Sequence, residues 1–419
     1  MKSTLALKAL LLLVAVAVID RQAVAADWPA WRGADRTGLC TETGLLASWP
    51  EGGPKLLWNI EGLGEGYSTP SIVRGVLFVM GNRGGNEQVI AWDIRSTPRE
   101  LWAATVGPVR YDGAGYPGPR STPTFDEGKL YAIGLNGDLV CLDARDGRLV
   151  WKRDLVGDFG GGLPNWGYSE SPLVTGDWVL CTPGGARATI AALDKKTGET
   201  IWESPVGDRA AYSSLIAARL AGRDQFVQFT AQGVIGVDAA DGKFLWRWDE
   251  PANGTANVTT PVHVGENRIF DASGYGRGGG VVEIKPAGDG VEAEELYFTR
   301  DMKNHHGGVV LFDGYLYGSN DPGLLTCLDA ETGKVKWRDR SSGKGSLLYA
   351  DGHLYVRSEE GRVSLVEATP DGFHLKGRFD QPDRSETPSW PHPVISDGRL
   401  YLRDQDRLLC YAVRSDEGS

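Results

Sequence analysis

A phrase of eleven residues recurs along the chain and constrains the fold more than any other feature of the sequence. It reads CLDARDGRLVW, ALDKKTGETIW, GVDAADGKFLW and CLDAETGKVKW. In each copy an Asp precedes a Trp by eight residues, and a Gly precedes the same Trp by four. A looser copy, AWDIRSTPRELW, places Asp93 nine residues before Trp102. The copies recur about every 40 to 50 residues, which is the period of a four-stranded propeller blade.

One unit of the repeat, Ser121 to Arg153, can be read in full as four short strands separated by turns at DEG, NG and RDG. Such turns need Gly where φ is positive. A four-stranded antiparallel sheet cannot bury both of its faces alone, so the copies must stack around an axis. We therefore expect the Asp and Gly of the phrase to shape turns. We expect the Trp to wedge between neighbouring sheets, with its N–H free for a backbone acceptor.

The ends of the repeat array indicate how the ring closes. Eight outer strands can be counted, of which two, at 294–300 and 373–379, lack the Trp. The tail from His392 to Val413 supplies three strands and no fourth, whereas Pro54 to Ile60 is an outer strand with no inner three. Joining these two pieces in one blade leaves no free sheet edge. The sequence predicts an all-β fold: one eight-bladed β-propeller of four-stranded antiparallel blades over residues 54–413.

The termini carry separate signals. Residues 1–25 contain two lysines, an apolar run from Leu5 to Ile19 and small residues before Ala26, which predicts a cleaved signal peptide. The mature protein is expected in the periplasm or the medium, without a lipid anchor. The apolar run is short for a membrane span, and no other segment approaches the required length. We expect residues 26–53 to pack on the propeller and residues 414–419 to form a C-terminal tail.

Charge and cysteine content exclude several functions. The formal net charge is −11 and no lysine or arginine cluster is present, so neither nucleic acid nor an anionic membrane surface is an expected partner. The five cysteines are an odd number for an exported protein. Cys141, Cys327 and Cys410 occupy equivalent places in different repeats, so we expect small buried side chains rather than a disulfide or metal set. We expect a monomer.

The recurring phrase resembles the pyrroloquinoline-quinone (PQQ) propeller repeat, whose consensus is close to A-x-D-x-x-T-G-x-x-x-W. That family includes quinoprotein alcohol dehydrogenases and the propeller lipoprotein of the outer-membrane protein assembly machinery. The resemblance covers nearly all of the mature chain and implies the eight-bladed fold. It does not define the function, because one propeller supports many chemistries.

In such propellers, each segment that leads from an outer strand to the next inner strand lies on one face, around the central channel. Aromatic and charged residues in these segments, Tyr116 among them, are expected near one channel mouth. A ring of aromatic faces, Arg, Lys and His could hold a planar or anionic small ligand or an extended peptide. The alternative is that these side chains only plug and hydrate the channel. The candidate ligand-binding residues are Tyr67, Arg120, Trp166, Tyr168, Glu170, Tyr212, Asn257, His305, His306, Lys344, Trp390 and His392.

No metal site is expected from the sequence. His305 and His306 are adjacent, and consecutive residues on a strand point to opposite sides. No carboxylate or Cys lies at ligand spacing beside them, which favours histidines with structural or ligand-contact roles. The run SGYGRGGG from Ser273 matches G-x-G-x-x-G, but a strand follows it instead of a helix, so we expect a flexible hairpin tip.

The phrase DWPAWRGADRTG, which begins at Asp27, precedes the first strand. Its Trp28, Trp31, Arg32 and Arg36 are expected to pack across the ring, with a ligand role as the alternative.

The functional prediction is an exported, non-catalytic propeller that acts as a scaffold for an unknown small ligand or an exported protein or peptide. No catalytic residue and no firm cofactor is assigned. The quinoproteins that the repeat resembles often have adjacent cysteines, and some bind haem at C-x-x-C-H; this chain has neither motif. The alternative is a small quinoprotein dehydrogenase of alcohols or sugars, in which Glu170 and Asn257 would help to hold Ca²⁺ beside PQQ. Scaffolding of outer-membrane proteins is a third possibility.

Overall fold

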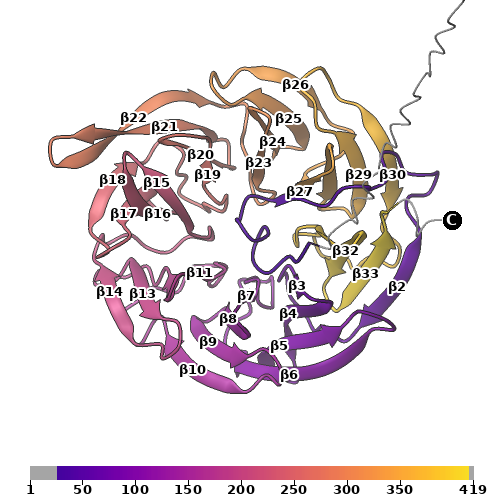
Figure 1. The fold of residues 1–419 in the computed structure, drawn as a ribbon, viewed down its shortest axis with the longest axis horizontal. Helices are drawn as coiled ribbons and strands as arrows, with labels where there is room; N and C mark the ends of the chain where they lie inside the picture. The colour runs from indigo at the N-terminus through magenta and orange to yellow at the C-terminus, as the bar shows by residue number, and fades with distance from the viewer. Residues whose placement is uncertain (1–25, 415–419) are drawn as a thin grey trace, which may run out of the picture.

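The computed structural model describes residues 26–414. The predicted signal peptide and residues 415–419 of the predicted tail lie outside the described residues. Eight blades, each built from four antiparallel strands, are arranged around a central axis, which confirms the predicted all-β propeller (Figure 1). One blade carries an additional parallel strand from the N-terminal segment. In each blade the first strand is the innermost. No helix in residues 26–414 is long and apolar enough to cross a membrane.

The blades are numbered here in chain order. Blade 1 contains β3 (Ser71–Val73), β4 (Val76–Arg83), β5 (Asn86–Asp93) and β6 (Arg99–Pro108), and blade 2 contains β7 (Thr124–Asp126), β8 (Lys129–Ile133), β9 (Asp138–Asp143) and β10 (Leu149–Asp154). Blade 3 contains β11 (Leu173–Thr175), β12 (Trp178–Cys181), β13 (Ile190–Asp194) and β14 (Thr200–Ser204), and blade 4 contains β15 (Ile216–Leu220), β16 (Arg223–Phe229), β17 (Val234–Asp238) and β18 (Phe244–Trp248).

The second half of the ring follows the same order. Blade 5 contains β19 (Val262–His263), β20 (Arg268–Ser273), β21 (Gly278–Ala287) and β22 (Gly290–Thr299), and blade 6 contains β23 (Val309–Phe312), β24 (Tyr315–Asn320), β25 (Leu324–Asp329) and β26 (Val335–Asp339). Blade 7 contains β27 (Gly345–Ala350), β28 (His353–Ser358), β29 (Arg362–Glu367) and β30 (Leu375–Asp380), and blade 8 contains β31 (Val394–Ser396), β32 (Arg399–Asp404), β33 (Arg407–Ala412) and β2 (Leu56–Glu61).

Blade 8 closes the ring as the sequence predicts. The N-terminal strand β2 pairs antiparallel with β33, from Leu56 opposite Tyr411 to Glu61 opposite Arg407. The two outer strands that lack the Trp are β22 and β30, and both complete their blades. The last blade therefore contains strands from both ends of the chain, and no sheet edge is left open between the two ends.

The recurring phrase forms a contact between neighbouring blades. Gly147, in the turn between β9 and β10, has φ +72°, and a Cβ there would lie 2.6 Å from the ring of Trp102 in the preceding blade. The indole N–H of Trp102 donates to the carbonyl of Ala144 in the same turn, at 3.3 Å. Trp151 packs in the same way on Gly198 of blade 3. The Gly thus accommodates the Trp of the blade before it, and the predicted wedge of the Trp is confirmed. The predicted backbone bond is present for Trp151 and Trp337, whereas Trp246 donates to the side chain of Gln225 and the buried Trp202 Nε1 has no acceptor among the described residues.

The segment before β2 crosses the middle of the ring (Figure 1). Trp28 exchanges two backbone hydrogen bonds with Ile72 of blade 1, at 2.7 and 2.8 Å. Farther along, β1 (Leu39–Cys40) pairs in parallel with β27 of blade 7. Between these points Arg32 donates to the carbonyl of Val309, and Arg36 donates to the carbonyls of Ser171 and Pro172. This segment therefore ties blades on opposite sides of the ring to one another.

Two smaller predictions also have a structural counterpart. Cys141, Cys327 and Cys410 are all buried, as expected for small apolar side chains. The glycine-rich run forms the turn between β20 and β21, a hairpin connection rather than the start of a helix.

The ring closure can be tested at Arg403, whose fully buried guanidinium joins the last blade to the first. It donates to the carbonyl oxygens of Ser68 and Gly64, at 2.9 and 3.0 Å. Arg403→Met leaves these acceptors buried without a donor, so we expect the free energy of unfolding to fall by about 3 kcal/mol or more in urea titrations. Arg219→Met, which removes an exposed pair with Asp224, should cost less than about 1 kcal/mol. Equal losses in the two variants would contradict this role.

Candidate functional site

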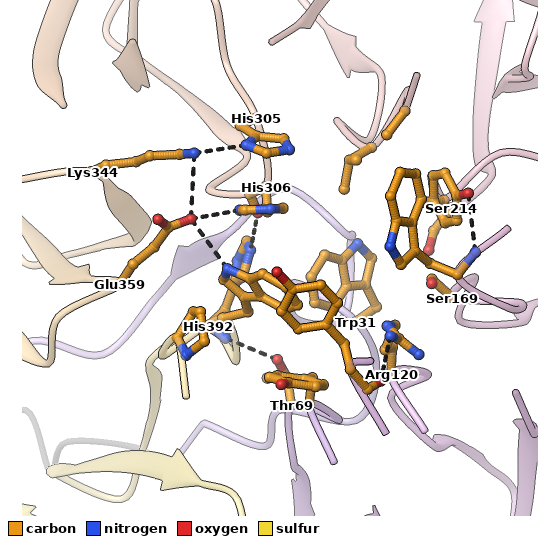
Figure 2. Close-up of a pocket in the computed structure, with 18 of the residues that line it drawn as sticks. Trp31, Thr69, Arg120, Ser169, Ser214, His305, His306, Lys344, Glu359 and His392 are labelled. Carbon is orange, nitrogen blue, oxygen red and sulfur yellow. Dashed lines mark hydrogen bonds and ion pairs between the residues drawn. The ribbon is translucent and has the colours of Figure 1, made fainter. Parts of the chain in front are cut away.

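A cavity of about 390 Å³ opens at one mouth of the channel (Figure 2). Each of the eight segments between an outer strand and the next inner strand contributes at least one side chain to it. The convergence expected from the repeat is therefore present. Of the twelve candidate residues, nine line the cavity: Tyr67, Arg120, Trp166, Tyr212, His305, His306, Lys344, Trp390 and His392.

The other three candidates, Tyr168, Glu170 and Asn257, are buried and do not line the cavity. The Tyr168 hydroxyl donates to a backbone carbonyl at 2.8 Å, and the Asn257 amide donates to another at 3.0 Å. Their immediate neighbours do line the cavity: Ser169 between the first two, and Ala256 and Val258 around Asn257. Side chains alternate along an extended segment, so a segment can reach the mouth while every second residue points away from it.

The cavity also contains residues that the sequence analysis did not choose as candidates. Six of them lie in the expected outer-to-inner segments: Thr69, Ser169, Ser214, Ala256, Val258 and Pro388. Three others come from elsewhere in the chain. Tyr275 lies in the β20–β21 turn and Glu359 in the β28–β29 turn. In a propeller blade the turn between the second and third strands opens on the same face as the outer-to-inner segments, so blade topology could have identified both. Trp31, expected to pack across the ring, does so and also lines the cavity, with its Nε1–H donated to Thr260 Oγ1 at 2.9 Å.

Aromatic rings form much of the cavity wall. The Trp390 ring lies 4.7 Å from the ring of Tyr67, 4.8 Å from that of Tyr116 and 4.8 Å from that of His306, between centroids. Trp166 and Tyr212 line the same cavity and meet edge to face at 5.7 Å between ring centroids. Such surfaces favour the burial of a planar or apolar group.

The polar part of the cavity is a cluster around Glu359 (Figure 2). Its Oε1 lies 3.0 Å from His306 Nδ1 and accepts the Trp390 indole N–H at 3.1 Å. The Lys344 ammonium lies 3.5 Å from the same oxygen and 2.7 Å from His305 Nδ1. The carboxylate thus connects side chains from three different segments.

The structure corrects two sequence-based arguments about the histidine pair. His305 and His306 lie in segment 300–308, outside any strand, and their rings stack with centroids 3.6 Å apart instead of pointing to opposite sides. A carboxylate does lie beside them: Glu359, which is more than fifty residues farther along the chain, is brought next to His306 by the packing of its blade. Both arguments against a metal site are therefore wrong for this pair.

Metal-ligand atoms gather at one place in the described part of the chain. Candidate ligand atoms of His305, His306 and Glu359 all lie within 4.8 Å of one another. Zn²⁺ bound by imidazole and carboxylate would need these atoms about 3.3 Å apart in a tetrahedral site. The Lys344 ammonium already makes the contact to His305 Nδ1. A metal ion could use these ligands only after this ammonium had moved away.

Burial sets the protonation of the cluster. Loss of solvent, together with the neighbouring His306 and Lys344, lowers the pKa of His305 to about 2. Burial also lowers the pKa of His392 to about 3, aided by the charge of Arg32. For Glu359 burial acts in the opposite direction, but the hydrogen bond from His306 and the nearby charges lower its pKa to about 2. At neutral pH the histidines are neutral and Glu359 is ionised.

His392 provides a test of this protonation state. Its pKa falls from 6.5 to about 3 on folding, so between these pH values the unfolded chain binds a proton that the folded chain does not. The stability that neutral His392 contributes is complete above pH 6.5 and is lost as the pH falls. Between pH 7 and pH 5, we expect the wild type to lose about 2 kcal/mol more than His392→Gln, measured by urea unfolding. Parallel pH profiles would contradict the depressed pKa.

The fold and the repeats define the class of this protein, an eight-bladed β-propeller of PQQ-like repeats. A family model described as outer membrane protein assembly factor BamB matches residues 97–339 and 293–373, which together span more than half of the chain. The chain belongs to this family.

The similar proteins include both assembly factors and quinohemoprotein dehydrogenases. The chain is 25% identical to outer membrane protein assembly factor BamB of Shewanella oneidensis, over 76% of this chain and 79% of that protein. It is 26% identical to quinohemoprotein alcohol dehydrogenase ADH-IIG of Pseudomonas putida, over 60% of this chain and 33% of that protein. The crystal structure of quinohemoprotein alcohol dehydrogenase from Comamonas testosteroni superimposes with a TM-score of 0.68 over 92% of this chain and 80% of that one, at 15% identity. That likeness shows the shared fold.

Proposed function

We propose that this protein is an exported, non-catalytic scaffold that binds a partner protein at the channel mouth. The observation that carries the proposal is the convergence of all eight outer-to-inner segments on one aromatic-walled cavity. Eight rigid blades hold these segments in place, which is the arrangement expected of a binding surface on a preformed scaffold. The family adds support, because the relative in Shewanella oneidensis is named as an assembly factor. The predicted signal peptide would deliver the protein to the periplasm or the medium.

The alternative, a PQQ-dependent dehydrogenase with Ca²⁺, fits the cavity residues poorly. Glu170 Oε2 accepts the backbone N–H of Thr182 at 2.7 Å, and Oε1 accepts from Gln228 at 3.1 Å. Asn257 Oδ1 accepts the N–H of Asn253 at 2.9 Å. The two residues expected to hold Ca²⁺ therefore use these oxygens inside the protein. Glu359, which does face the cavity, is shared by Lys344, His306 and Trp390.

The dehydrogenase alternative is tested by titrating the mature protein, starting at Ala26, with PQQ in a calorimeter, with and without Ca²⁺. We expect no calcium-dependent saturation at micromolar quinone, because the expected calcium ligands do not reach the cavity. A dye-linked assay with primary alcohols and aldose sugars should show no quinone-dependent reduction. Quinone-dependent turnover of any of these substrates would overturn the non-catalytic assignment.

Partner binding is tested at the cavity rim in the native host. Tyr116 lies at the rim and is 36% exposed, so a photoreactive p-benzoylphenylalanine at this position would face a bound partner. We expect a discrete cross-linked adduct after irradiation of intact cells. Leu149, 49% exposed on the outer strand β10, is the matched control and should give none. Adducts of equal yield at both positions, or none at Tyr116, would contradict binding at the mouth.

A further inference from the structure

The cavity contains two cations, and their surroundings differ. The Lys344 ammonium has two acidic neighbours, Asp321 at 3.4 Å and Glu359 at 3.5 Å. The Arg120 guanidinium makes its hydrogen bonds to backbone carbonyls, those of Tyr116 at 2.7 Å and Gly118 at 3.2 Å. Among the described residues no carboxylate lies within ion-pair distance of Arg120. Lys344 is therefore neutralised by the protein, and Arg120 is not.

Glu87 is the carboxylate whose charge acts on Arg120 beyond ion-pair distance, and it does not fully compensate the guanidinium. Both of its carboxylate oxygens accept the backbone N–H of Leu135 at 3.0 Å. Burial, only partly offset by that N–H, raises the pKa of Glu87 to about 7, so the group is partly protonated at neutral pH. The positive charge at the Arg120 end of the cavity is left without a full counter-charge.

Arg120 also has donors left to offer. A guanidinium carries five N–H groups, and the two backbone bonds leave most of them free. Burial lowers the pKa of Arg120 to about 10, which leaves it charged at neutral pH. Charges shielded from water in proteins are ordinarily paired. The half-buried Arg120 lines the cavity without an ion-pair partner among the described residues, so it marks a position for an anion. One cation matches a single negative charge, and a planar guanidinium fits a carboxylate with two parallel bonds.

Aromatic rings and a hydroxyl line the same cavity as this cation. The Arg120 guanidinium lies 5.6 Å from the centroid of the Tyr67 ring. Figure 2 shows Arg120 and Ser169 at one side of the cavity, with Lys344 and Glu359 at the other. Ser169 also lines the cavity, and its Oγ has no hydrogen-bond partner among the described residues. The edge-to-face pair of Trp166 and Tyr212 lines the same cavity and offers ring surface to a planar group.

We propose that this cavity binds a carboxylate carried next to an aromatic ring, with Arg120 pairing with the carboxylate and the aromatic wall covering the ring. The inference rests on the proposed function and deepens it by naming the chemistry of the bound group. That group is either the end of a polypeptide chain with an aromatic last residue or a free aromatic acid. Both sources present the same carboxylate and ring.

The test compares two probes that differ by one charge. N-acetyl-tryptophan and N-acetyl-tryptophanamide share the ring, and only the first has a carboxylate. In calorimetric titrations of the mature wild type we expect the acid to bind about tenfold more tightly than the amide, and this preference to shrink with added salt. The peptide Ala-Ala-Ala-Ala-Trp with a free carboxylate separates the sources: tighter binding than N-acetyl-tryptophan indicates a chain end, and weaker binding indicates a free acid.

Variants assign the preference to one side chain. Arg120→Gln should bind acid and amide equally, and Arg120→Lys should keep part of the preference because the charge remains without the planar fork. Arg219→Gln removes an exposed arginine that pairs with Asp224 outside this cavity, so it is the matched control and should keep the preference. Should Arg120→Gln fail to fold, Arg120→Lys and the salt dependence still decide the question.

The outcomes separate this inference from the proposed function. Equal binding of acid and amide to the wild type, or a preference that survives in Arg120→Gln, would overturn the role of Arg120. If neither probe binds while the cross-link at Tyr116 persists, the ligand chemistry is wrong and partner binding stands. Quinone-dependent turnover would overturn the non-catalytic function, whatever the probes show.

Discussion

The packing of an aromatic side chain of one blade on a turn glycine of the next is the interaction on which the rest of the structure depends. Gly147, Gly198 and Gly242 all have φ near +70°, and a Cβ at any of them would collide with the Trp of the preceding blade. Where the Trp is absent, Tyr297 takes its place over Gly333, and its hydroxyl donates to the carbonyl of Ala330 at 3.0 Å. The contact fixes the distance and angle between neighbouring blades, and its repetition generates a ring.

A ring of this kind creates a binding surface as a consequence of its geometry. Each blade delivers one outer-to-inner segment to the same mouth, so side chains that are far apart in the chain become neighbours in one cavity. The N-terminal segment lies across the middle of the ring, and its Trp31 closes the cavity against His392, with ring centroids 4.6 Å apart. The cavity is thus open toward one face and bounded by the chain's own N-terminal segment.

Charge is distributed unevenly inside the cavity. Glu359 is held by Lys344, His306 and Trp390, and the neutral histidines beside it add no charge. Arg120 stands apart with backbone partners alone. The Lys344 charge is balanced by Glu359, whereas the Arg120 charge has no acidic partner at ion-pair distance, so the cavity favours an anionic group beside Arg120. Such a defined position allows a scaffold to bind one kind of segment and to reject another.

The sequence by itself determined the blade, the number of blades and the closure of the ring, because these follow from a local pattern of Asp, Gly and Trp that repeats along the chain. It also placed the outer-to-inner segments at one mouth. The sequence could not decide which side chains of those segments enter the cavity. Side chains alternate along an extended segment, so Ser169 reaches the cavity while Tyr168 and Glu170 on either side of it are buried in the protein. Nor could the sequence place Glu359 beside the histidine pair. That contact joins two blades, and the distance between residues so far apart in the chain is set by how the blades pack, which only the tertiary structure decides.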